Sequence, residues 1–478
     1  MKIHSLKFNA LMNMVLTSSS FIFPLITVPY VSRVLNPTGM GAVSFAQSII
    51  SYFSLAALLG ISMYGVRACA QVRDNQAELS RTVEELLIIL TVSTTIVFII
   101  YLGTLTFVPR FASDRSLFLV FSVALWLASF GVEWFYQAIE QYGYITVRSI
   151  VVKLIGLILM FTFVHQTSDY RVYGMIVVFT GYGANILNIL RLRSLIVLVP
   201  LRQLNVLRHF KPMRSFFISS VSSGMYAQAD MVMLGFLSTN HVVGLYQLVS
   251  KIKTILVTAI NSVVNVMLPR LSYYAKNSKE KYQDLLIKNI DFVLLFASAG
   301  IVCAALCPDA IIGILGGEQY RAAVIPLLCI LPALLFVSLN TVLSQYLVSS
   351  GRERQYAIVN FIGLICSIAY CLLLIPSFGA TGAALSCSLC EFTALLVRCW
   401  FSRDFIRSII QDIQLIPAPT AAIVSGAVVI FIRTSWWPNN PFIQIMTTGI
   451  IFSIFYFCML FLLKERTIIA VINNIRKH

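Results

Sequence analysis

The chain has 478 residues, of which 58% are hydrophobic and only 11% are charged, and its mean hydropathy is +0.86. This composition excludes an ordinary soluble globular protein and predicts an integral membrane protein. The formal net charge of +16 would suit a nucleic-acid-binding protein, but the basic residues are spread over successive short segments. Anionic membrane lipids, and no nucleic acid, are therefore the expected partners of this charge.

Apolar windows of about 20 residues, the length that a helix needs to cross a bilayer, recur about fourteen times along the chain. The first seven expected spans are residues 11–31, 42–66, 86–108, 117–138, 144–164, 173–190 and 216–237. The second seven are residues 242–268, 285–306, 322–348, 356–375, 380–400, 416–432 and 442–463. The predicted fold is an all-α integral membrane protein with about 14 transmembrane helices.

The distribution of basic residues predicts the orientation of these spans. If the N-terminus is cytoplasmic, most of the 35 Lys and Arg residues fall on the cytoplasmic side of the membrane, as the positive-inside rule requires. A single missed span would destroy this asymmetry. With an even number of spans, both termini are expected in the cytoplasm.

The first span contains a polar cluster at residues 17–20, followed by Pro24 and Pro29. Proline removes a backbone hydrogen bond and kinks a helix. Pro24 and Pro29 are therefore candidates for a hinge, although a static kink explains them equally well. The segment SRVLNPTGMGAVSFAQSI that follows predicts a tight turn at its Asn-Pro pair, before the second span.

Two colinear matches indicate an internal duplication. GAVSFAQSI at residues 41–49 recurs as GLYQLVSKI at 244–252, and VVKLIGLI at 151–158 recurs as IVNFIGLI at 358–365. Each half then holds six spans and inserts the same way up, which predicts two lobes related by a pseudo-twofold axis along the membrane normal, with a cleft between them.

The duplication divides the chain into four predicted parts. These are an N-terminal lobe of spans 1–6 (residues 1–190), a basic cytoplasmic linker (191–214), a C-terminal lobe of spans 7–12 (215–403), and two extra spans with a cytoplasmic tail (404–478). Basic and apolar residues alternate in the linker, which suggests an amphipathic helix on the inner leaflet.

Three lysines fall inside predicted spans, where a charge costs roughly 2.5–3.5 kcal/mol or more. Lys153 lies near the midpoint of the fifth span and Lys253 near the midpoint of the eighth, with Lys251 two residues earlier. If the lobes face each other, these ammonium groups form a cationic cleft suited to a diphosphate. Alternatively, each lysine is tied to a carboxylate for structural reasons.

Two acidic residues are candidates for ion pairs between neighbouring spans. Asp230 and Lys251 lie at comparable depth on the two arms of a hairpin, and their pair is either structural or linked to the substrate. Glu133 and Arg148 occupy the two arms of the hairpin formed by the fourth and fifth spans. The same two interpretations apply to that pair, with a structural role favoured.

Glu391, near the middle of the twelfth span, is a candidate for coupling to H⁺ or Na⁺, or else a partner for Arg398 or for a lysine of another span. Apart from such an ion, no cofactor and no metal are expected. Cys387 and Cys390 form a C-x-x-C motif without a second pair or a nearby His. The chain also has no GxxxxGK[ST] phosphate loop and no room for a soluble catalytic domain, so it is expected to transport and not to act as an enzyme.

Four stretches resemble the O-antigen and capsule repeat-unit flippases, which are the Wzx or polysaccharide-transporter family. That family belongs to a superfamily that also holds multidrug and toxin extruders and the lipid II flippase. The stretches are PYVSRVLNPTGMGAVSFAQSIISYF from Pro29, LGISMYGVRACAQVRDN from Leu59, EWFYQAIEQYGYITVRSI from Glu133 and DMVMLGFLSTNHVVGLYQLVSKI from Asp230.

The resemblance implies that the chain moves undecaprenyl-diphosphate-linked oligosaccharide repeat units from the cytoplasmic to the outer leaflet of the bacterial inner membrane. It implies alternating access, a role in O-antigen or capsule biosynthesis, and the polymerase and chain-length proteins of the same pathway as partners. Family members have a cationic cavity, which suits Lys153 and Lys253.

Two alternatives stay open at this point. The first is a multidrug or toxin extruder of the same superfamily, whose cationic drugs fit poorly beside lysines in the middle of the membrane. The second is a membrane polymerase of lipid-linked sugars. Such an enzyme would need a sizeable exported loop with arginines and a catalytic acid or base, whereas the exported loops expected here are short and poor in charge.

Overall fold

The computed structural model describes residues 6–435 and 438–469, and this part of the chain is 89% helical with no strand. Eleven stretches are long and apolar enough to cross a membrane. Two of these stretches contain two spans each: Leu11–Val72, which breaks at Asn36, and Glu353–Phe401, which breaks at Gly379. With the 28-residue helix α10 (Phe210–Leu237) added, the predicted number of 14 long helices is confirmed.

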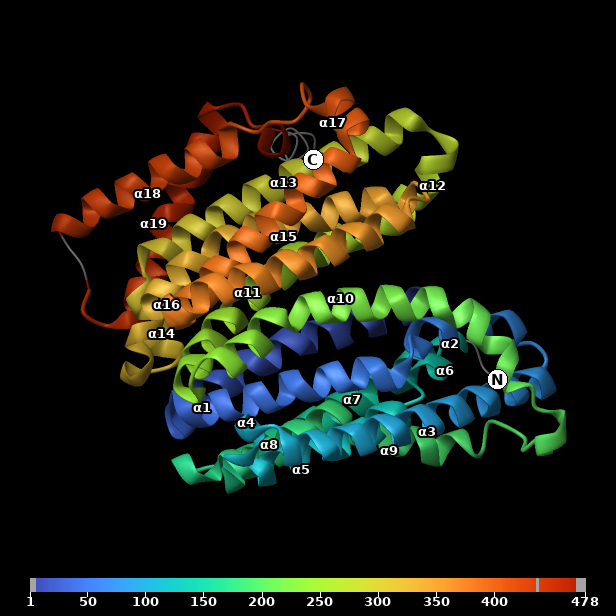
Figure 1. The fold of residues 1–478 in the computed structure, drawn as a ribbon. Coiled ribbons are helices and arrows are strands. Elements are labelled where there is room, and N and C mark those ends of the chain that lie inside the picture. The colour runs from blue at the N-terminus through green and yellow to red at the C-terminus, as the bar shows by residue number, and fades with distance from the viewer. Residues whose placement is uncertain (1–5, 436–437, 470–478) are drawn as a thin grey trace. The chain divides into compact units, whose positions relative to one another are not determined.

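The chain forms two compact units, Met1–Gly244 and Leu245–His478 (Figure 1). Unit 1 contains α1 (Leu6–Leu58), α2 (Ile61–Val72), α3 (Gln76–Phe107), α4 (Pro109–Ala112), α5 (Arg115–Ser129), α6 (Glu133–Ala138), α7 (Tyr142–Phe163), α8 (Tyr170–Val178), α9 (Ala184–Leu192) and α10. Helix α11 (Asn240–Val266) begins in unit 1 and continues into unit 2. Unit 2 also contains α12 (Leu268–Asn277), α13 (Lys279–Leu306), α14 (Pro308–Leu315), α15 (Val324–Ser349), α16 (Glu353–Phe401), α17 (Arg403–Ile409), α18 (Pro417–Ser435) and α19 (Pro441–Leu462).

Helix α1 is two helices joined at the predicted Asn-Pro turn. Asn36 has φ 61° and ψ 167°, which is outside the helical region. Pro37 disfavours the helical region for the residue before it, in agreement with the extended ψ of Asn36, and the combination with a positive φ is rare for residues other than Gly. Pro24 and Pro29 lie inside the first of the two helices, and their role as a hinge stays a prediction.

Helix α10, the seventh predicted span, packs on α1 and α2 within unit 1 (Figure 1). The Tyr52 hydroxyl donates to the Met225 carbonyl at 2.7 Å, and Leu55 packs against Gly224, where a Cβ would lie only 2.5 Å from the leucine side chain. The contacts therefore divide the chain after Gly244. The lobe boundary near residue 215 rests on the sequence repeat, and it stays a prediction.

The linker does not form the amphipathic helix that its alternating basic and apolar residues suggested. Residues 193–205 contain turns, backbone without regular secondary structure and one short 3₁₀ segment. Their backbone N–H groups bond to side chains of α3 instead: Val197 donates to Ser80 Oγ at 3.0 Å and Val199 donates to the Glu84 carboxylate at 3.0 Å. Because Ser80 and Glu84 accept hydrogen bonds from the amides of Val197 and Val199, these amides do not need the carbonyl partners that a helix would provide.

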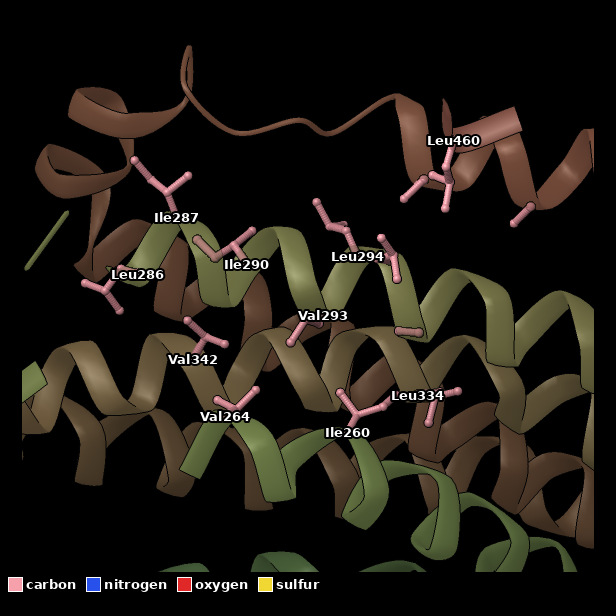
Figure 2. Close-up of a cluster of buried hydrophobic side chains, with 14 of the residues drawn as sticks. Ile260, Val264, Leu286, Ile287, Ile290, Val293, Leu294, Leu334, Val342 and Leu460 are labelled. Atoms are coloured by element: carbon pink, nitrogen blue, oxygen red, sulfur yellow. The ribbon is translucent and has the colours of Figure 1, made fainter. Parts of the chain in front are cut away.

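The apolar core of unit 2 lies between α11, α13, α15 and α19, and Figure 2 shows side chains from these helices directed into it. The labelled residues are Ile260, Val264, Leu286, Ile287, Ile290, Val293, Leu294, Leu334, Val342 and Leu460, each no more than 8% exposed. In a membrane protein such a core is held mainly by close packing of side chains, because lipid tails are as apolar as the core itself.

Candidate functional site

Lys153 on α7 contacts the polar cluster of the first span. Its Nζ donates hydrogen bonds to Ser19 Oγ at 2.8 Å and to Ser20 Oγ at 3.2 Å, and it lies 5.8 Å from the centroid of the Phe23 ring. All three partners are uncharged. Within residues 6–435 and 438–469, no carboxylate forms an ion pair with Lys153. The lysine therefore keeps an uncompensated positive charge in the middle of a predicted span.

The two serines are oriented by their own helix. Ser19 Oγ donates to the Leu16 carbonyl at 2.6 Å, and Ser20 Oγ donates to the same carbonyl at 3.2 Å. Because each hydroxyl hydrogen is used in the helix, the oxygen lone pairs are left to accept from the ammonium group. The polar cluster of α1 thus holds Lys153 in place without neutralising it.

The other two membrane lysines lie in unit 2. Lys253 on α11 donates to Cys387 Sγ on α16 at 3.1 Å. Lys251 is half-buried, and among the described residues of unit 2 it has no carboxylate partner. Because Lys153 belongs to the other unit, a cationic cleft that combines the three lysines stays a prediction.

Glu133 and Arg148 form an ion pair at a break between helices. Arg148 Nη2 lies 2.9 Å from Glu133 Oε2, and the arginine side chain is 3% exposed. Its Nη1 also donates to the Ala184 carbonyl at 3.3 Å. Helix α5 ends at Ser129, and Val132 has φ 38° before α6 starts at Glu133. The pair links α6 to α7 and to the start of α9, which favours the structural interpretation.

Two asparagines on α9 bond to carbonyls that this break leaves without helical partners. Asn185 Nδ2 donates to the Leu127 carbonyl at 2.9 Å, and Asn188 Nδ2 donates to the Gly131 carbonyl. The Asn188 carbonyl in turn accepts from the Tyr136 hydroxyl at 2.8 Å. Buried backbone acceptors need such partners at membrane depth, so these amides have a structural role.

The remaining predicted carboxylates have local partners. Glu391 Oε2 accepts from Asn340 Nδ2 at 2.8 Å, while Arg398 donates to Asn360 Oδ1 at 3.0 Å. Asp230 accepts from the backbone N–H of Met231 at 2.8 Å. Asp230 belongs to unit 1, and its predicted partner on α11 belongs to unit 2. Their pairing, and a coupling role for Glu391, stay predictions.

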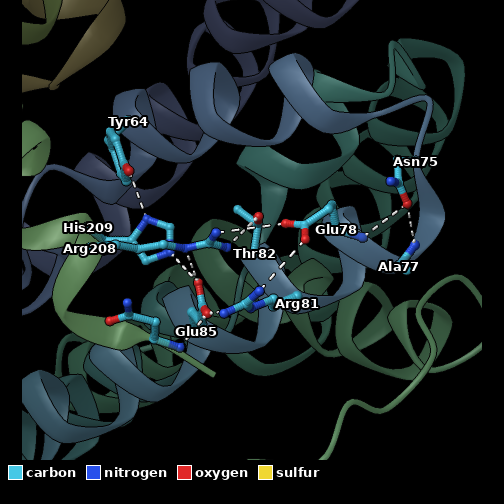
Figure 3. Close-up of polar contacts among 10 residues, drawn as sticks. Tyr64, Asn75, Ala77, Glu78, Arg81, Thr82, Glu85, Arg208 and His209 are labelled. Atoms are coloured by element: carbon cyan, nitrogen blue, oxygen red, sulfur yellow. Dashed lines mark hydrogen bonds and ion pairs between the residues drawn. The ribbon is translucent and has the colours of Figure 1, made fainter. Parts of the chain in front are cut away.

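A buried polar cluster, shown in Figure 3, was not predicted from the sequence. It is centred on Glu85 of α3, whose side chain is 0% exposed. This carboxylate accepts from the Asn205 backbone N–H at 2.6 Å, Arg81 Nε at 3.1 Å, Arg208 Nε at 2.7 Å and His209 Nε2 at 2.7 Å. A buried carboxylate is tolerated when it is paired and fully hydrogen-bonded, and Glu85 meets this condition.

His209 connects this cluster to α2. Its Nδ1 lies 2.7 Å from the Tyr64 hydroxyl, and its Nε2 lies 2.7 Å from Glu85 Oε2. A carboxylate only accepts hydrogen bonds, so Nε2 donates to Glu85 and Nδ1 can accept from Tyr64, which is the pattern of a neutral imidazole. Burial lowers the pKa of His209, while the Glu85 carboxylate opposes this effect. The cluster ties the second half of the linker to α2 and α3.

A second polar network lies at the opposite end of unit 1, where α1 turns at Asn36. Arg110 Nε donates to the Gly235 carbonyl at 2.8 Å, and its Nη2 donates to Asn240 Oδ1 at 2.6 Å. Asp114 accepts from Asn240 Nδ2 at 3.3 Å and from the Tyr170 hydroxyl at 2.6 Å. Parts of this network line a cavity of about 590 Å³. The bonds hold the start of α11 against α4, α5 and α8.

Comparison with known proteins identifies the family. Residues 6–275 match the family described as polysaccharide biosynthesis protein. The chain belongs to this family. Proteins named as O-antigen transporters from Escherichia coli (strain K12) and Shigella dysenteriae are 25% and 23% identical to it, and each alignment covers 82% of the chain and 96% or more of the relative. The resemblance to O-antigen flippases is thus confirmed, and the polysaccharide-biosynthesis family is one of transporters and not of enzymes.

Solved structures confirm the fold of this family member. The lipid II flippase MurJ in an inward closed conformation superposes with a TM-score of 0.73 at 14% identity, covering 93% of the chain and 98% of MurJ. A multidrug resistance MATE family transporter in an inward-facing conformation superposes with a TM-score of 0.66 at 14% identity, covering 81% of the chain and 95% of that transporter. At such identities the likeness concerns the fold and not the substrate.

Proposed function

We propose that this protein is a flippase that moves undecaprenyl-diphosphate-linked oligosaccharide repeat units from the cytoplasmic to the outer leaflet of the bacterial inner membrane. Its product would supply O-antigen or capsule synthesis, with the polymerase and chain-length proteins of that pathway as partners. The observation that carries the proposal is the charge of Lys153. Its ammonium group donates to two serine hydroxyls and has no carboxylate partner in the described chain.

The chemistry of the cargo explains this arrangement. A diphosphate carries its negative charge wherever the lipid goes, and hydrocarbon excludes it. An ammonium group at mid-membrane depth offers the charge-assisted hydrogen bonds that such an anion needs. Since the serines already orient Lys153, binding of the diphosphate would not require ordering a flexible side chain. The sugar head would then cross in a hydrophilic path while the lipid tail stays in the bilayer.

Alternating access also agrees with the polar networks found at the two ends of unit 1. Arg110, Asn240 and Asp114 join helices at the end that the positive-inside rule assigns to the outside. Opening that end requires loss of these bonds, while the Glu85 cluster holds the cytoplasmic end of α2 and α3 together. We infer that the network around Arg110 opens and closes during transport, and that the Glu85 cluster stays intact.

Lysines alone do not supply energy for net transport. The membrane potential is worth about 2.3 kcal/mol per charge per 100 mV, and an inside-negative potential favours outward movement of net negative charge. Protonation or sodium binding at Glu391 is the proposed second contribution, because this carboxylate lies near the middle of a span with Asn340 as a neutral partner.

The multidrug extruder remains the alternative, because the fold neighbours include a multidrug transporter. The two functions differ in the charge of the cargo. A cationic drug would be repelled by Lys153, whereas a diphosphate would be attracted to it.

The test is transport by the purified protein in proteoliposomes. We expect movement of a labelled undecaprenyl-diphosphate oligosaccharide between leaflets, and no export of a cationic dye such as ethidium. Protein-free vesicles serve as the control. Export of the dye without movement of the lipid would overturn the proposal in favour of the multidrug extruder.

A further inference from the structure

A polar cavity in unit 2 lies at the open end of the α16 hairpin, and none of the membrane lysines lines it. Because α16 turns at Gly379 (φ 53°), its first and last residues lie at the same end. Arg352 Nη1 accordingly donates to the Phe401 carbonyl at 3.3 Å. The cavity has a volume of about 390 Å³ and is lined by Arg352, Gln355, Trp400, Phe401, Arg403 and Asp404.

The charge of this cavity is positive and mostly uncompensated. Arg352 is oriented by the Phe401 carbonyl and by the Tyr346 ring, whose centroid lies 5.8 Å from the guanidinium carbon. Its other N–H groups have no acceptor among the residues that the structure describes. Arg403 has one acidic contact, Asp404 at 3.8 Å, and both of these side chains are more than 60% exposed. Such a long and exposed pair neutralises little charge.

A neutral hydrogen-bond acceptor lies beside the two arginines. Gln355 Oε1 is buried, and within the described part of the chain it has no hydrogen-bond partner. A buried polar atom without a partner is uncommon in folded proteins and often marks a position where a ligand or water binds. An amide oxygen at this position can accept a hydrogen bond from a ligand hydroxyl.

One side of the cavity continues into an apolar surface. Trp400 is 62% exposed, and Leu396, one helical turn earlier on α16, is 53% exposed. Tryptophan at the end of a membrane helix prefers the level of the lipid headgroups. A phosphate bound by the arginines would therefore lie at headgroup level, with apolar chains passing along Trp400 and Leu396.

We propose that this cavity binds the headgroup of an anionic phospholipid, with Arg352 and Arg403 on the phosphate and Gln355 accepting from a headgroup hydroxyl. Arginine suits this role because its planar guanidinium donates two parallel hydrogen bonds to phosphate oxygens. Basic pockets between transmembrane helices are known places for anionic lipid headgroups. Lys153 is not among the residues that line this cavity, and the proposal does not depend on the transport function.

The test measures lipid binding to the purified full-length protein by native mass spectrometry, without transport. We expect phosphatidylglycerol to bind at least tenfold more tightly than phosphatidylcholine. Arg352→Gln and Arg403→Gln should each weaken phosphatidylglycerol binding by about fivefold. The wild type should also prefer phosphatidylglycerol to phosphatidic acid, whose headgroup has no alcohol hydroxyl, and Gln355→Leu should remove this preference. Arg403 is exposed, so its variant keeps the test informative even if the Arg352 variant folds poorly.

Arg354→Gln is the matched control, because Arg354 is exposed, lies in the same segment and does not line the cavity. It removes the same charge, and we expect less than about a twofold effect. An equal effect of Arg354→Gln and Arg403→Gln would mean that general surface charge attracts the lipid, and it would overturn the proposal. Displacement of the lipid by millimolar inorganic phosphate would also overturn it, by assigning the cavity to a free phosphate.

Discussion

Gly41 and Gly244 occupy equivalent positions in the internal repeat. Each of them lies against the backbone of the segment that immediately precedes the other glycine in the sequence. A Cβ on Gly41 would lie 1.7 Å from the Asn240 carbonyl oxygen, and a Cβ on Gly244 would lie 1.8 Å from the Pro37 carbonyl oxygen. Asn240 and Pro37 each precede the opposing glycine by four residues. The two contacts are therefore reciprocal within unit 1.

This close approach predicts that Gly41→Ala and Gly244→Ala disturb the second half of α1 and the start of α11. The added methyl groups would meet backbone atoms, which cannot move aside as a flexible side chain can. We expect a loss of roughly 1–3 kcal/mol in the free energy of unfolding for each variant, seen as a lower midpoint of thermal unfolding in detergent. Gly103→Ala is the control, because nothing lies within 4 Å of its Cβ position. Equal behaviour of all three variants would contradict the close contact.

The buried carboxylate of Glu85 predicts a large structural effect of its removal. Glu85→Ala leaves Arg81, Arg208 and the Asn205 amide without their shared acceptor. We expect a loss of about 3–5 kcal/mol, the usual cost of breaking a buried ion pair, and faster proteolysis of the linker. Glu78→Ala should cost much less, because Glu78 is 43% exposed and its pairs with the same two arginines are 3.7 Å long. Similar melting points for the two variants would refute the role assigned to Glu85.

His209 predicts a pH dependence of stability. Burial lowers the pKa of the folded-state imidazole below the ordinary value of about 6.5 in the unfolded chain. The unfolded chain then binds more protons at acidic pH, so the contribution of His209 is complete above about pH 6.5 and is lost as the pH falls toward the lowered pKa. We expect the thermal midpoint to fall between pH 7 and pH 5, and to fall less in His209→Gln. Parallel profiles for the two proteins would show that another group is responsible.

The pair of Glu133 and Arg148 allows a test that separates structure from transport. Arg148→Gln should cost roughly 3 kcal/mol because it breaks a pair whose arginine is buried. The double variant Glu133→Gln/Arg148→Gln should recover part of this loss, since neither charge is then left unpaired. If the pair is structural, transport by the double variant should be close to that of the wild type. A double variant that is stable but inactive would assign the pair to the substrate or to coupling.

Much of the fold could be predicted from the sequence because the bilayer imposes simple rules. Windows of apolar residues predicted the 14 long helices, and the Asn-Pro dipeptide predicted the turn at Asn36. The family resemblance could also be found from the sequence, because it rests on contiguous stretches of residues. The break at Val132 was missed, since residues 117–138 are apolar enough to predict one uninterrupted span, although Val132 has φ 38°.

The contacts of the candidate site were harder to predict from the sequence, because they join distant segments. Lys153 was singled out from its cost in the membrane, but its partner Ser19 is 134 residues away. The Glu85 cluster joins α3 to residues about 120 positions later, and no periodicity connects them. The alternation of basic and apolar residues in the linker predicts an amphipathic helix, because this pattern takes no account of hydrogen-bond acceptors on other helices. The Glu84 carboxylate accepts a hydrogen bond from the Val199 amide and favours an irregular path.

The most direct test of the central claim is flipping of undecaprenyl-diphosphate oligosaccharide in proteoliposomes by wild type, Lys153→Gln and Lys253→Gln. Lys276→Gln is the control, because Lys276 is an exposed lysine on α12. With melting points close to wild type, we predict at least a tenfold lower rate for Lys153→Gln, a clear loss for Lys253→Gln and no change for Lys276→Gln. Transport by Lys153→Gln at the wild-type rate would contradict the claim that this lysine holds the diphosphate.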